Sequence, residues 1–407
     1  MRLVPLLFTI FIDSLGFGLA FPILSPLIMA EGGILPSEVS LALRGFIFGT
    51  LISSFCLGQF FSGPILGALS DRKGRKKILL ITVGMAFISY IFAGCAILEK
   101  SLVLLYFSRL MAGVAAGNYA IAQSMVVDCT SKEDRAKNFG LLGMAWGSGF
   151  IIGPFVGGHL SDSSMLAWFN FTTPFWFAAA LCLLNFALLL WKVKETLPAV
   201  QFCKMSLWMG VYHLKAAFKH PTLRGLFTVM FIFSLGWGFF TEFCPVFLLK
   251  HMHFSLAQIG NFYASVGLLV ALSQGIFIRP FLKRFTPQRL LCAALIGLGA
   301  SLLVLLLVDD LNMLMAVLPF LAVADSLIYP TSAALISNLS PKEAQGEILG
   351  INNSLQWAAI GICPMFSGSL VALYPHLPMS VAGASMFIAC GVLVWTMRKK
   401  KVGCSVD

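Results

Sequence analysis

The sequence predicts an all-α membrane protein in which twelve transmembrane helices form two related six-helix bundles. Hydrophobic residues make up 58% of the 407-residue chain and charged residues only 11%, whereas a soluble domain carries roughly 25% charged residues. Apolar stretches long enough to cross a bilayer, roughly 20 residues each, follow one another with short polar intervals. The two halves of the chain also repeat each other's motifs.

Six apolar stretches lie on each side of the longest polar interval. The first begins directly after Met1 and Arg2 and lacks a small-residue cleavage site, so we expect a retained helix and not a signal peptide. The predicted organisation is an N-terminal bundle (1–193), a cytoplasmic linker (194–221) and a C-terminal bundle (222–407). The expected helices lie near 4–28, 45–69, 78–98, 101–126, 138–160, 172–192, 222–249, 256–279, 290–308, 311–337, 345–373 and 379–397.

The basic residues predict the orientation. Of the 28 Lys and Arg residues, 24 fall in intervals on the side of the N-terminus, and only Arg44, Lys100 and Lys250 fall in the opposite loops. Basic loops stay in the cytoplasm, and an even number of helices then places both termini there. The net charge of +11 is therefore a topology signal, and no nucleic-acid partner is expected.

The cysteines and histidines give no sign of a metal or disulfide framework. None of the ten cysteines forms a CxxC pair, and most lie inside apolar runs. The pair His251 and His253 near an outer loop does not by itself make a metal site.

The halves match each other at an offset of 210 residues. Gly140, Pro154 and Gly158 in the fifth helix correspond to Gly350, Pro364 and Gly368 in the eleventh. Internal repeats of this kind are typical of secondary transporters.

A glycine-rich and charged segment joins the second and third helices. It reads Gly67-Ala-Leu-Ser-Asp71-Arg72-Lys73-Gly74-Arg75-Lys76. The alternative is an ordinary basic cytoplasmic loop, but the GxxxDRxGRK spacing resembles the signature loop of the major facilitator superfamily. The resemblance implies that Asp71 meets the start of the eleventh helix, near 347–350, and latches the halves in the outward-open state. It also implies that Arg75 pairs with Asp128 at the end of the fourth helix.

The fifth helix carries glycines every four residues, at Gly149, Gly153 and Gly157, which places them on one ridge. Such a ridge allows close helix packing, and Pro154 bends the helix. A plain packing face is the alternative. The longer pattern of Gly140, Gly149, Gly153-Pro154 and Gly157-Gly158 resembles the antiporter motif of the same superfamily, whose members with this motif exchange substrate for protons.

Two further segments resemble the twelve-helix drug–proton antiporters, which include tetracycline efflux pumps. The first helix reads Phe11-Ile-Asp13-Ser-Leu-Gly16-Phe-Gly18 and continues to Pro22. The fourth helix reads Arg109-Leu-Met-Ala-Gly113-Val-Ala-Ala-Gly117-Asn118.

Four ionisable residues lie inside apolar helices and are candidates for proton coupling: Asp13, Arg109, Glu242 and Asp325. Asp13 and Arg109 each lie roughly 12–13 Å into their helices at 1.5 Å per residue, so a contact between them is possible. A carboxyl that a moving cavity alternately wets and dries changes its affinity for protons. The alternatives are a static Asp13–Arg109 pair, an outer vestibule for Glu242 and an interhelical hydrogen bond for Asp325.

Polar and aromatic residues within the helices are candidates for lining a substrate cavity. Each one taken alone is equally explained by packing or interhelical hydrogen bonding. The candidates are Phe17, Asn118, Gln123, Trp146, Trp237, Asn353, Gln356 and Trp357.

The function expected is proton-coupled efflux of a small amphipathic or drug-like compound, by antiport, from a bacterial cytoplasmic (inner) membrane. The alternative on the same fold is a proton symporter that imports a metabolite or siderophore, because fold alone fixes neither direction nor substrate. An enzyme or receptor is disfavoured, since no HExxH, nucleotide loop or nucleophile–base pair is found. The expected partners are the small-molecule substrate, protons and the lipid bilayer. No cofactor is expected, and one chain is enough for a pathway.

Overall fold

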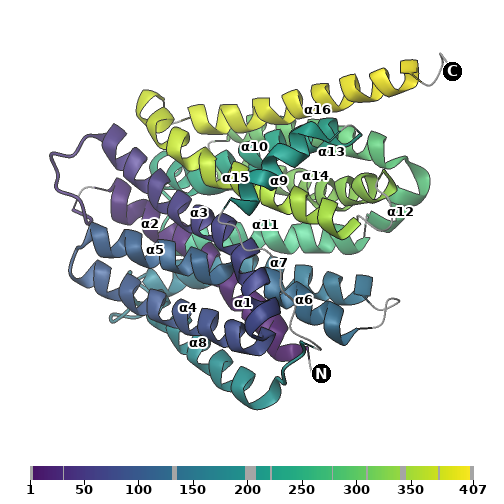
Figure 1. Cartoon of the computed structure of the whole chain (residues 1–407). Helices are drawn as coiled ribbons and strands as arrows, with labels where there is room; N and C mark the ends of the chain where they lie inside the picture. The colour runs from purple at the N-terminus through teal and green to yellow at the C-terminus, as the bar shows by residue number, and fades with distance from the viewer. Residues whose placement is uncertain are drawn as a thin grey trace. The chain divides into compact units, whose positions relative to one another are not determined.

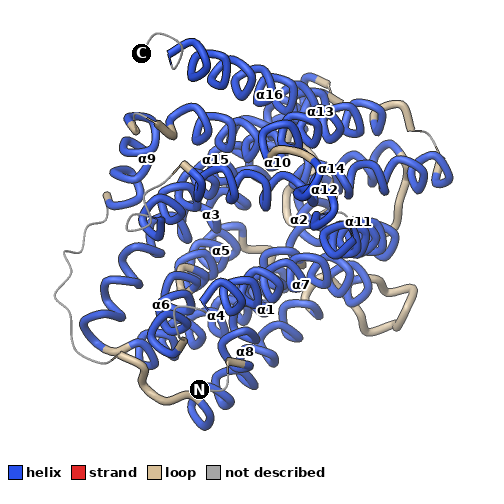
Figure 2. Tube along the Cα trace, turned by 90° about the vertical axis from the view of Figure 1, so that its right-hand side faces the viewer, coloured by secondary structure: helices blue, strands red, loops and turns tan. Residues whose placement is uncertain are grey.

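A computed structural model describes residues 3–30, 32–130, 135–197, 208–220, 222–276, 278–308, 310–339, 345–374 and 376–403. Every regular element formed by these residues is a helix (Figures 1 and 2). The helices are α1 (Val4–Gly18), α2 (Ala20–Met29), α3 (Leu41–Lys73), α4 (Arg75–Leu98), α5 (Leu102–Ala116), α6 (Tyr119–Cys129), α7 (Arg135–Ser161), α8 (Thr173–Lys192), α9 (Met209–Lys219), α10 (Arg224–His251), α11 (Leu256–Ile276), α12 (Ile278–Arg284), α13 (Pro287–Leu305), α14 (Leu311–Asn338), α15 (Gln345–Leu373) and α16 (Leu377–Gly403).

The predicted membrane helices are present. Within the described residues, eleven segments are long and apolar enough to cross a bilayer, and they match the first ten predicted helices and the twelfth. The eleventh predicted helix, near 345–373, is formed as α15. The short helix α9 lies inside the segment predicted as the linker.

Two of the predicted helices are each divided into two pieces. The first is α1 followed by α2, with Leu19 between them. Pro22 explains this break, because a proline has no N–H and its ring clashes with the carbonyl four residues earlier, here that of Gly18. The fourth is α5 followed by α6, divided at Gly117 and Asn118.

Helix ends differ from the predictions at the second helix. The helix α3 starts at Leu41 and runs to Lys73, so Arg44, expected in an outside loop, lies in its first turn and is only 3% exposed. At the other end, Asp71 and Arg72 are helical, and the loop expected there reduces to Gly74. Its φ of 101° is a conformation that glycine adopts without strain. Lys250, also expected in an outside loop, falls within α10.

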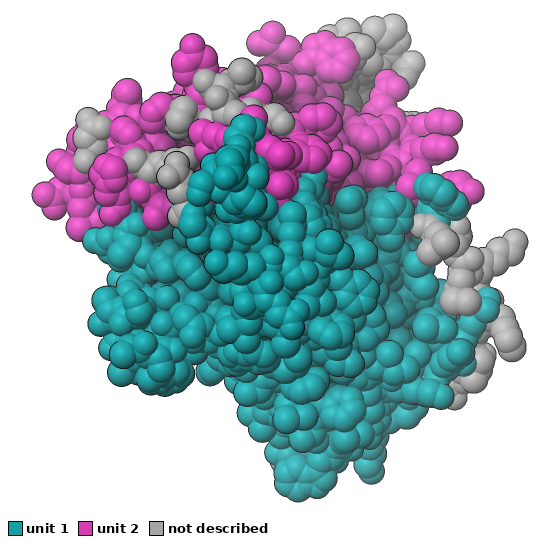
Figure 3. Space-filling view, turned by 90° about the vertical axis from the view of Figure 1, so that its left-hand side faces the viewer, with its two compact units in different colours: residues 1–40, 50–210, 254–264 teal, residues 41–49, 211–253, 265–407 magenta. Residues whose placement is uncertain are grey.

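The chain divides into two compact units, coloured separately in Figure 3. Unit 1 comprises residues 1–40, 50–210 and 254–264, and unit 2 comprises residues 41–49, 211–253 and 265–407. Inside unit 1, α1 packs on α7, and α4 packs on α5 and α8. Inside unit 2, α10 packs on α15, and α13 packs on α14 and α16. In each unit, the first predicted helix therefore packs on the fifth, and the third packs on the fourth and the sixth, counted within that half. The repeat seen in the sequence is thus also a repeat of helix packing.

The glycine ridge of α7 sits directly on the backbone of the first helix. A Cβ atom at Gly149 would lie 2.3 Å from the carbonyl oxygen of Phe11, and one at Gly153 would lie 2.5 Å from that of Leu15. One at Gly157 would lie 2.7 Å from the carbonyl oxygen of Leu19. The three glycines and the three carbonyl groups that they contact are therefore both spaced by four residues. Any residue larger than glycine would clash with the backbone of the first helix at these positions.

The ridge predicts that Gly153→Ala destabilises the protein. The added methyl group would have to displace helix backbone, and overpacking of this kind costs roughly 1–3 kcal/mol. The free energy of unfolding, or the midpoint of thermal unfolding, of the purified protein in detergent measures the loss.

Gly147 in the same helix is the matched control, because nothing lies within 4 Å of a Cβ at that position. Gly147→Ala should leave the midpoint unchanged or raise it, since alanine favours a helix over glycine. Equal effects of the two substitutions would contradict the packing explanation.

Candidate functional site

Asp13 lies on α1 within unit 1, next to a few polar side chains of an otherwise apolar bundle. Its oxygen Oδ2 is buried and has no hydrogen-bond partner. The carboxamide of Asn118, at the break between α5 and α6, lies within range to interact with the carboxyl, yet neither polar atom of that carboxamide has an aligned hydrogen bond. Asp13 and Asn118 are thus neighbours without a well-aligned hydrogen bond between them.

Tyr90 on α4 is another of these polar neighbours. It is 3% exposed and lies within electrostatic range of both Asp13 and Arg109. Its hydroxyl packs against Gly16, where a Cβ atom would come within 1.5 Å of Oη. Glycine at position 16, one turn after Asp13, therefore makes room for the phenol.

Arg109 on α5 is buried, with 1% of its surface exposed. Its guanidinium lies over the ring of Phe55, 5.0 Å from the centroid, which is a cation–π arrangement. The atoms Nε and Nη2 have no hydrogen-bond partner. No ion pair joins Arg109 to Asp13 in the described structure, so the static pair considered from the sequence is not formed.

Unit 2 contains the other two buried acids. Glu242 on α10 is 0% exposed, and neither of its carboxyl oxygens has a hydrogen-bond partner. It therefore does not open into an outer vestibule. Asp325 on α14 is 8% exposed with Oδ1 unpartnered, and Tyr329, one turn later, lies within its electrostatic range.

A series of aromatic contacts begins at Tyr329, the neighbour of Asp325. The ring of Tyr329 meets Phe233 edge-on at 5.4 Å, and Phe233 stacks with Trp237 at 6.3 Å. Trp237 is half-buried. Flat apolar faces beside a carboxyl are surfaces on which an amphipathic molecule can bind.

The residues predicted to line a cavity have different surroundings. Phe17 is buried and stacks on Phe55 at 4.9 Å. Trp146 stacks on Phe150 at 5.5 Å, and its carbonyl accepts a hydrogen bond of 2.6 Å from Ser14, next to Asp13. Asn353 is exposed, and the half-buried members are Gln123, Trp146, Trp237, Gln356 and Trp357.

A second cluster lies at the junction of α3 and α4. Arg75 donates from Nε to Asp128 at 2.8 Å and from Nη1 to Asp71 at 2.6 Å. It also donates to the hydroxyl of Ser70, which in turn donates to the carbonyl of Gly67. The Arg75–Asp128 pair implied by the motif is therefore present, while the implied contact of Asp71 falls on residues 347–350, most of which lie outside the described side chains.

Sequence reasoning missed Glu195 in this cluster. Its carboxylate accepts hydrogen bonds from the backbone N–H groups of Arg75 at 2.9 Å and Lys76 at 3.1 Å. A negative group at a helix N-terminus satisfies free donors and complements the helix dipole. Thr196 adds a hydrogen bond of 3.3 Å to Asp128. No local pattern marks Glu195, because its partner lies 120 residues earlier.

Comparison with known proteins identifies the family. Residues 6–287 and 274–404 match the Major Facilitator Superfamily. The chain belongs to this superfamily. It is therefore an integral membrane transporter of small molecules and not an enzyme, and it carries the fold that its signature loop predicted.

Three similar proteins cover nearly the whole chain. The tetracycline resistance protein, class C, of Escherichia coli is 29% identical over 401 residues, which span 95% of each chain. Multidrug resistance protein 2 of Bacillus subtilis is 26% identical over 97% of this chain and 95% of its own. A solved structure of a bacterial homologue of the human lysosomal transporter Spinster shares the fold, with a TM-score of 0.76, 16% identity, and coverage of 97% and 96%.

The charge cluster predicts that Arg75→Gln lowers stability. Removing the guanidinium leaves Asp71 and Asp128 without their common partner, and losing hydrogen bonds to charged groups costs roughly 1.5–3 kcal/mol. Thermal unfolding of the purified protein measures the change.

Lys77→Gln is the control, because it removes the same charge two residues later from an exposed side chain. It should shift the unfolding midpoint very little. A similar loss in both variants would mean that total charge, and not the Arg75 network, sets the stability.

Proposed function

We propose that this transporter exports a small amphipathic or drug-like compound in exchange for protons, by alternating access in a bacterial cytoplasmic membrane. The observation that carries the proposal is the state of Asp13. Its carboxyl lies at membrane depth without a paired cation, so it can bind and release a proton without breaking an ion pair. The names of the resistance proteins to which the chain is similar support the efflux direction.

The coupling follows from a change in the surroundings of Asp13. When the surroundings of Asp13 are open to water on the side of high proton concentration, Asp13 takes a proton and becomes neutral. A neutral carboxyl costs less to bury, so the protein can then close around Asp13 and open to the other side. Tyr90 and Asn118 supply polar neighbours of Asp13. Arg109, which shares Tyr90 as a neighbour, favours proton release when the cycle brings it towards Asp13.

The remaining parts of the proposal concern the second half and the surface. Glu242 and Asp325 are further candidates for proton binding, and the aromatic series that begins at Tyr329 is the candidate for substrate binding. Asp71 is proposed to latch the two halves on the cytoplasmic side by meeting the start of the eleventh predicted helix, near 347–350. The 24 basic residues predicted on one side support a cytoplasmic position for both termini. The energy source is the proton gradient without a cofactor, and one chain forms the pathway.

The exchange predicts that substrate and protons move in opposite directions. In proteoliposomes with an acidic interior, tetracycline added outside should accumulate inside as protons leave. Collapse of the gradient with a protonophore should abolish accumulation. Accumulation driven only by protons moving in the same direction would instead establish the importer.

Asp13 is predicted to be required for this coupling. Asp13→Asn should abolish uphill transport in the same proteoliposomes, because the amide cannot carry a proton through the cycle. Passive exchange of labelled substrate at equal concentrations should persist, since it needs binding and movement but no net proton transfer.

Asp162 provides the control substitution. Hydrogen bonds from Ser164 hold the pKa of this half-buried carboxyl below its ordinary range, so it stays ionised near neutral pH and carries no proton. Asp162→Asn should therefore keep gradient-driven transport. Uphill transport by Asp13→Asn would remove Asp13 from the mechanism.

A further inference from the structure

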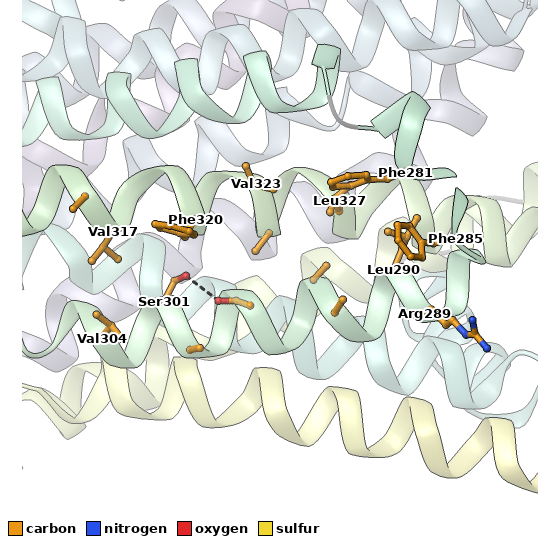
Figure 4. A pocket seen from close by; sticks show the side chains of 16 residues that line it. Phe281, Phe285, Arg289, Leu290, Ser301, Val304, Val317, Phe320, Val323 and Leu327 are labelled. Carbon is orange, nitrogen blue, oxygen red and sulfur yellow. Dashed lines mark hydrogen bonds between the residues drawn. The ribbon is translucent and has the colours of Figure 1, made fainter. Parts of the chain in front are cut away.

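An elongated groove runs between α13 and α14 in unit 2. Its lining includes Ala324 of α14 but not the neighbouring Asp325. The groove has a volume of about 1100 Å³. Figure 4 shows Arg289 at one end and Val304 and Val317 at the other. The lining residues are Phe281, Phe285, Arg289, Leu290, Ala293, Ala294, Gly297, Ala300, Ser301, Val304, Ala316, Val317, Phe320, Val323, Ala324 and Leu327.

The walls of the groove are almost entirely apolar, and they open to the outside of the chain. Phe320 is 73% exposed and Val304 is 42% exposed, and both belong to helices that are candidate membrane spans. The hydroxyl of Ser301 already donates to the carbonyl of Gly297 at 2.8 Å. Apart from Arg289, the lining therefore contains no side chain with an unsatisfied hydrogen-bonding group. Such a surface suits a hydrocarbon chain better than a polar solute.

The end of the groove is basic. Arg289 lies in the first turn of α13 and is exposed, and no described residue pairs with its side chain. Lys283 and Arg284, at the end of α12, are exposed as well, and residues 278–305 contain no acid. On the predicted topology this end faces the cytoplasmic leaflet, where anionic headgroups are concentrated.

The length of the groove matches a lipid chain that starts at this charge. From Arg289 to Val304 the helix advances fifteen residues, or roughly 22 Å at 1.5 Å per residue. This distance reaches from the headgroup level past the middle of a hydrocarbon core about 30 Å thick. The small residues Ala293, Gly297 and Ala300 line this length of α13, which leaves room for a chain beside the helix.

We propose that this groove binds one anionic phospholipid, with the phosphate on Arg289 and an acyl chain along Ala293 and Ala300. Lipid binding is measured directly, so the test requires no transport. The full-length protein in detergent is titrated with phosphatidylglycerol or with phosphatidylcholine of the same acyl chains, and native mass spectrometry counts the lipids retained.

The expected result is one phosphatidylglycerol retained more tightly than phosphatidylcholine. Arg289→Gln should weaken this binding about fivefold, the effect of one basic residue near an anionic headgroup. Arg398→Gln removes the same charge from another exposed arginine of unit 2 and should change little. Equal retention of both lipids, or equal effects of the two substitutions, would overturn the proposal.

A second pair of variants tests the acyl chain. Ala300→Trp fills the groove and should reduce phosphatidylglycerol binding, whereas Ile388→Trp on the exposed face of α16, where the native residue is 57% exposed, should not. Ala293→Trp replaces Ala300→Trp if that variant fails to fold. Unchanged binding in the folded filling variant would exclude the groove as the site. A dimer in the wild type that the filling variant loses would mean that a second copy occupies it instead.

Discussion

The close approach of α7 to the first helix is the constraint on which unit 1 depends. Three glycines spaced by four residues rest on three carbonyls with the same spacing, and a side chain at any of them would separate the two backbones. This contact sets the depth and rotation of α1, and therefore the place where Asp13 points. The hydrogen bond from Ser14 to the carbonyl of Trp146 fixes the same register one residue from the acid. A motif that appears as packing alone thus positions the group proposed for proton coupling.

The charged residues fall into two classes that the bilayer separates. Where α3 meets α4, Arg75 is shared by two carboxylates and the adjoining helix start is capped by a third. Inside the apolar spans the opposite holds, since Asp13, Glu242 and Asp325 have no ion-pair partner in the described structure and Arg109 rests on an aromatic ring. Buried charges without partners are costly, so a fold that needed them only for stability would pair them. Their isolation is what a protein needs if those charges must change during its cycle.

The sequence predicted the helices, the repeat and the two superfamily motifs because each depends on local spacing or on matches within the chain. It did not predict the role of Tyr90, since one tyrosine in an apolar helix has no pattern and its position depends on the missing side chain at Gly16. Nor did it indicate that Arg109 would lie over Phe55 and not beside Asp13, because similar depths in two helices do not fix their rotations. The break at Leu19 was readable from Pro22, whereas the buried position of Arg44 depended on where α3 begins, which local sequence defines poorly.

The contacts of Glu195 and Thr196 have a consequence for dividing the protein into its halves. The apolar pattern of the first bundle ends at 193, yet the next residues complete the start of α4 and hold Asp128. The residue before α4 is Gly74, which provides no side-chain cap. A first half that stops at residue 193 would therefore leave two backbone N–H groups at the start of α4 without a hydrogen-bond partner. A first half extended through Leu197 keeps them satisfied. The structural boundary of the bundle therefore lies several residues beyond its hydrophobic boundary, and the beginning of the connecting segment belongs to the folded unit that it follows.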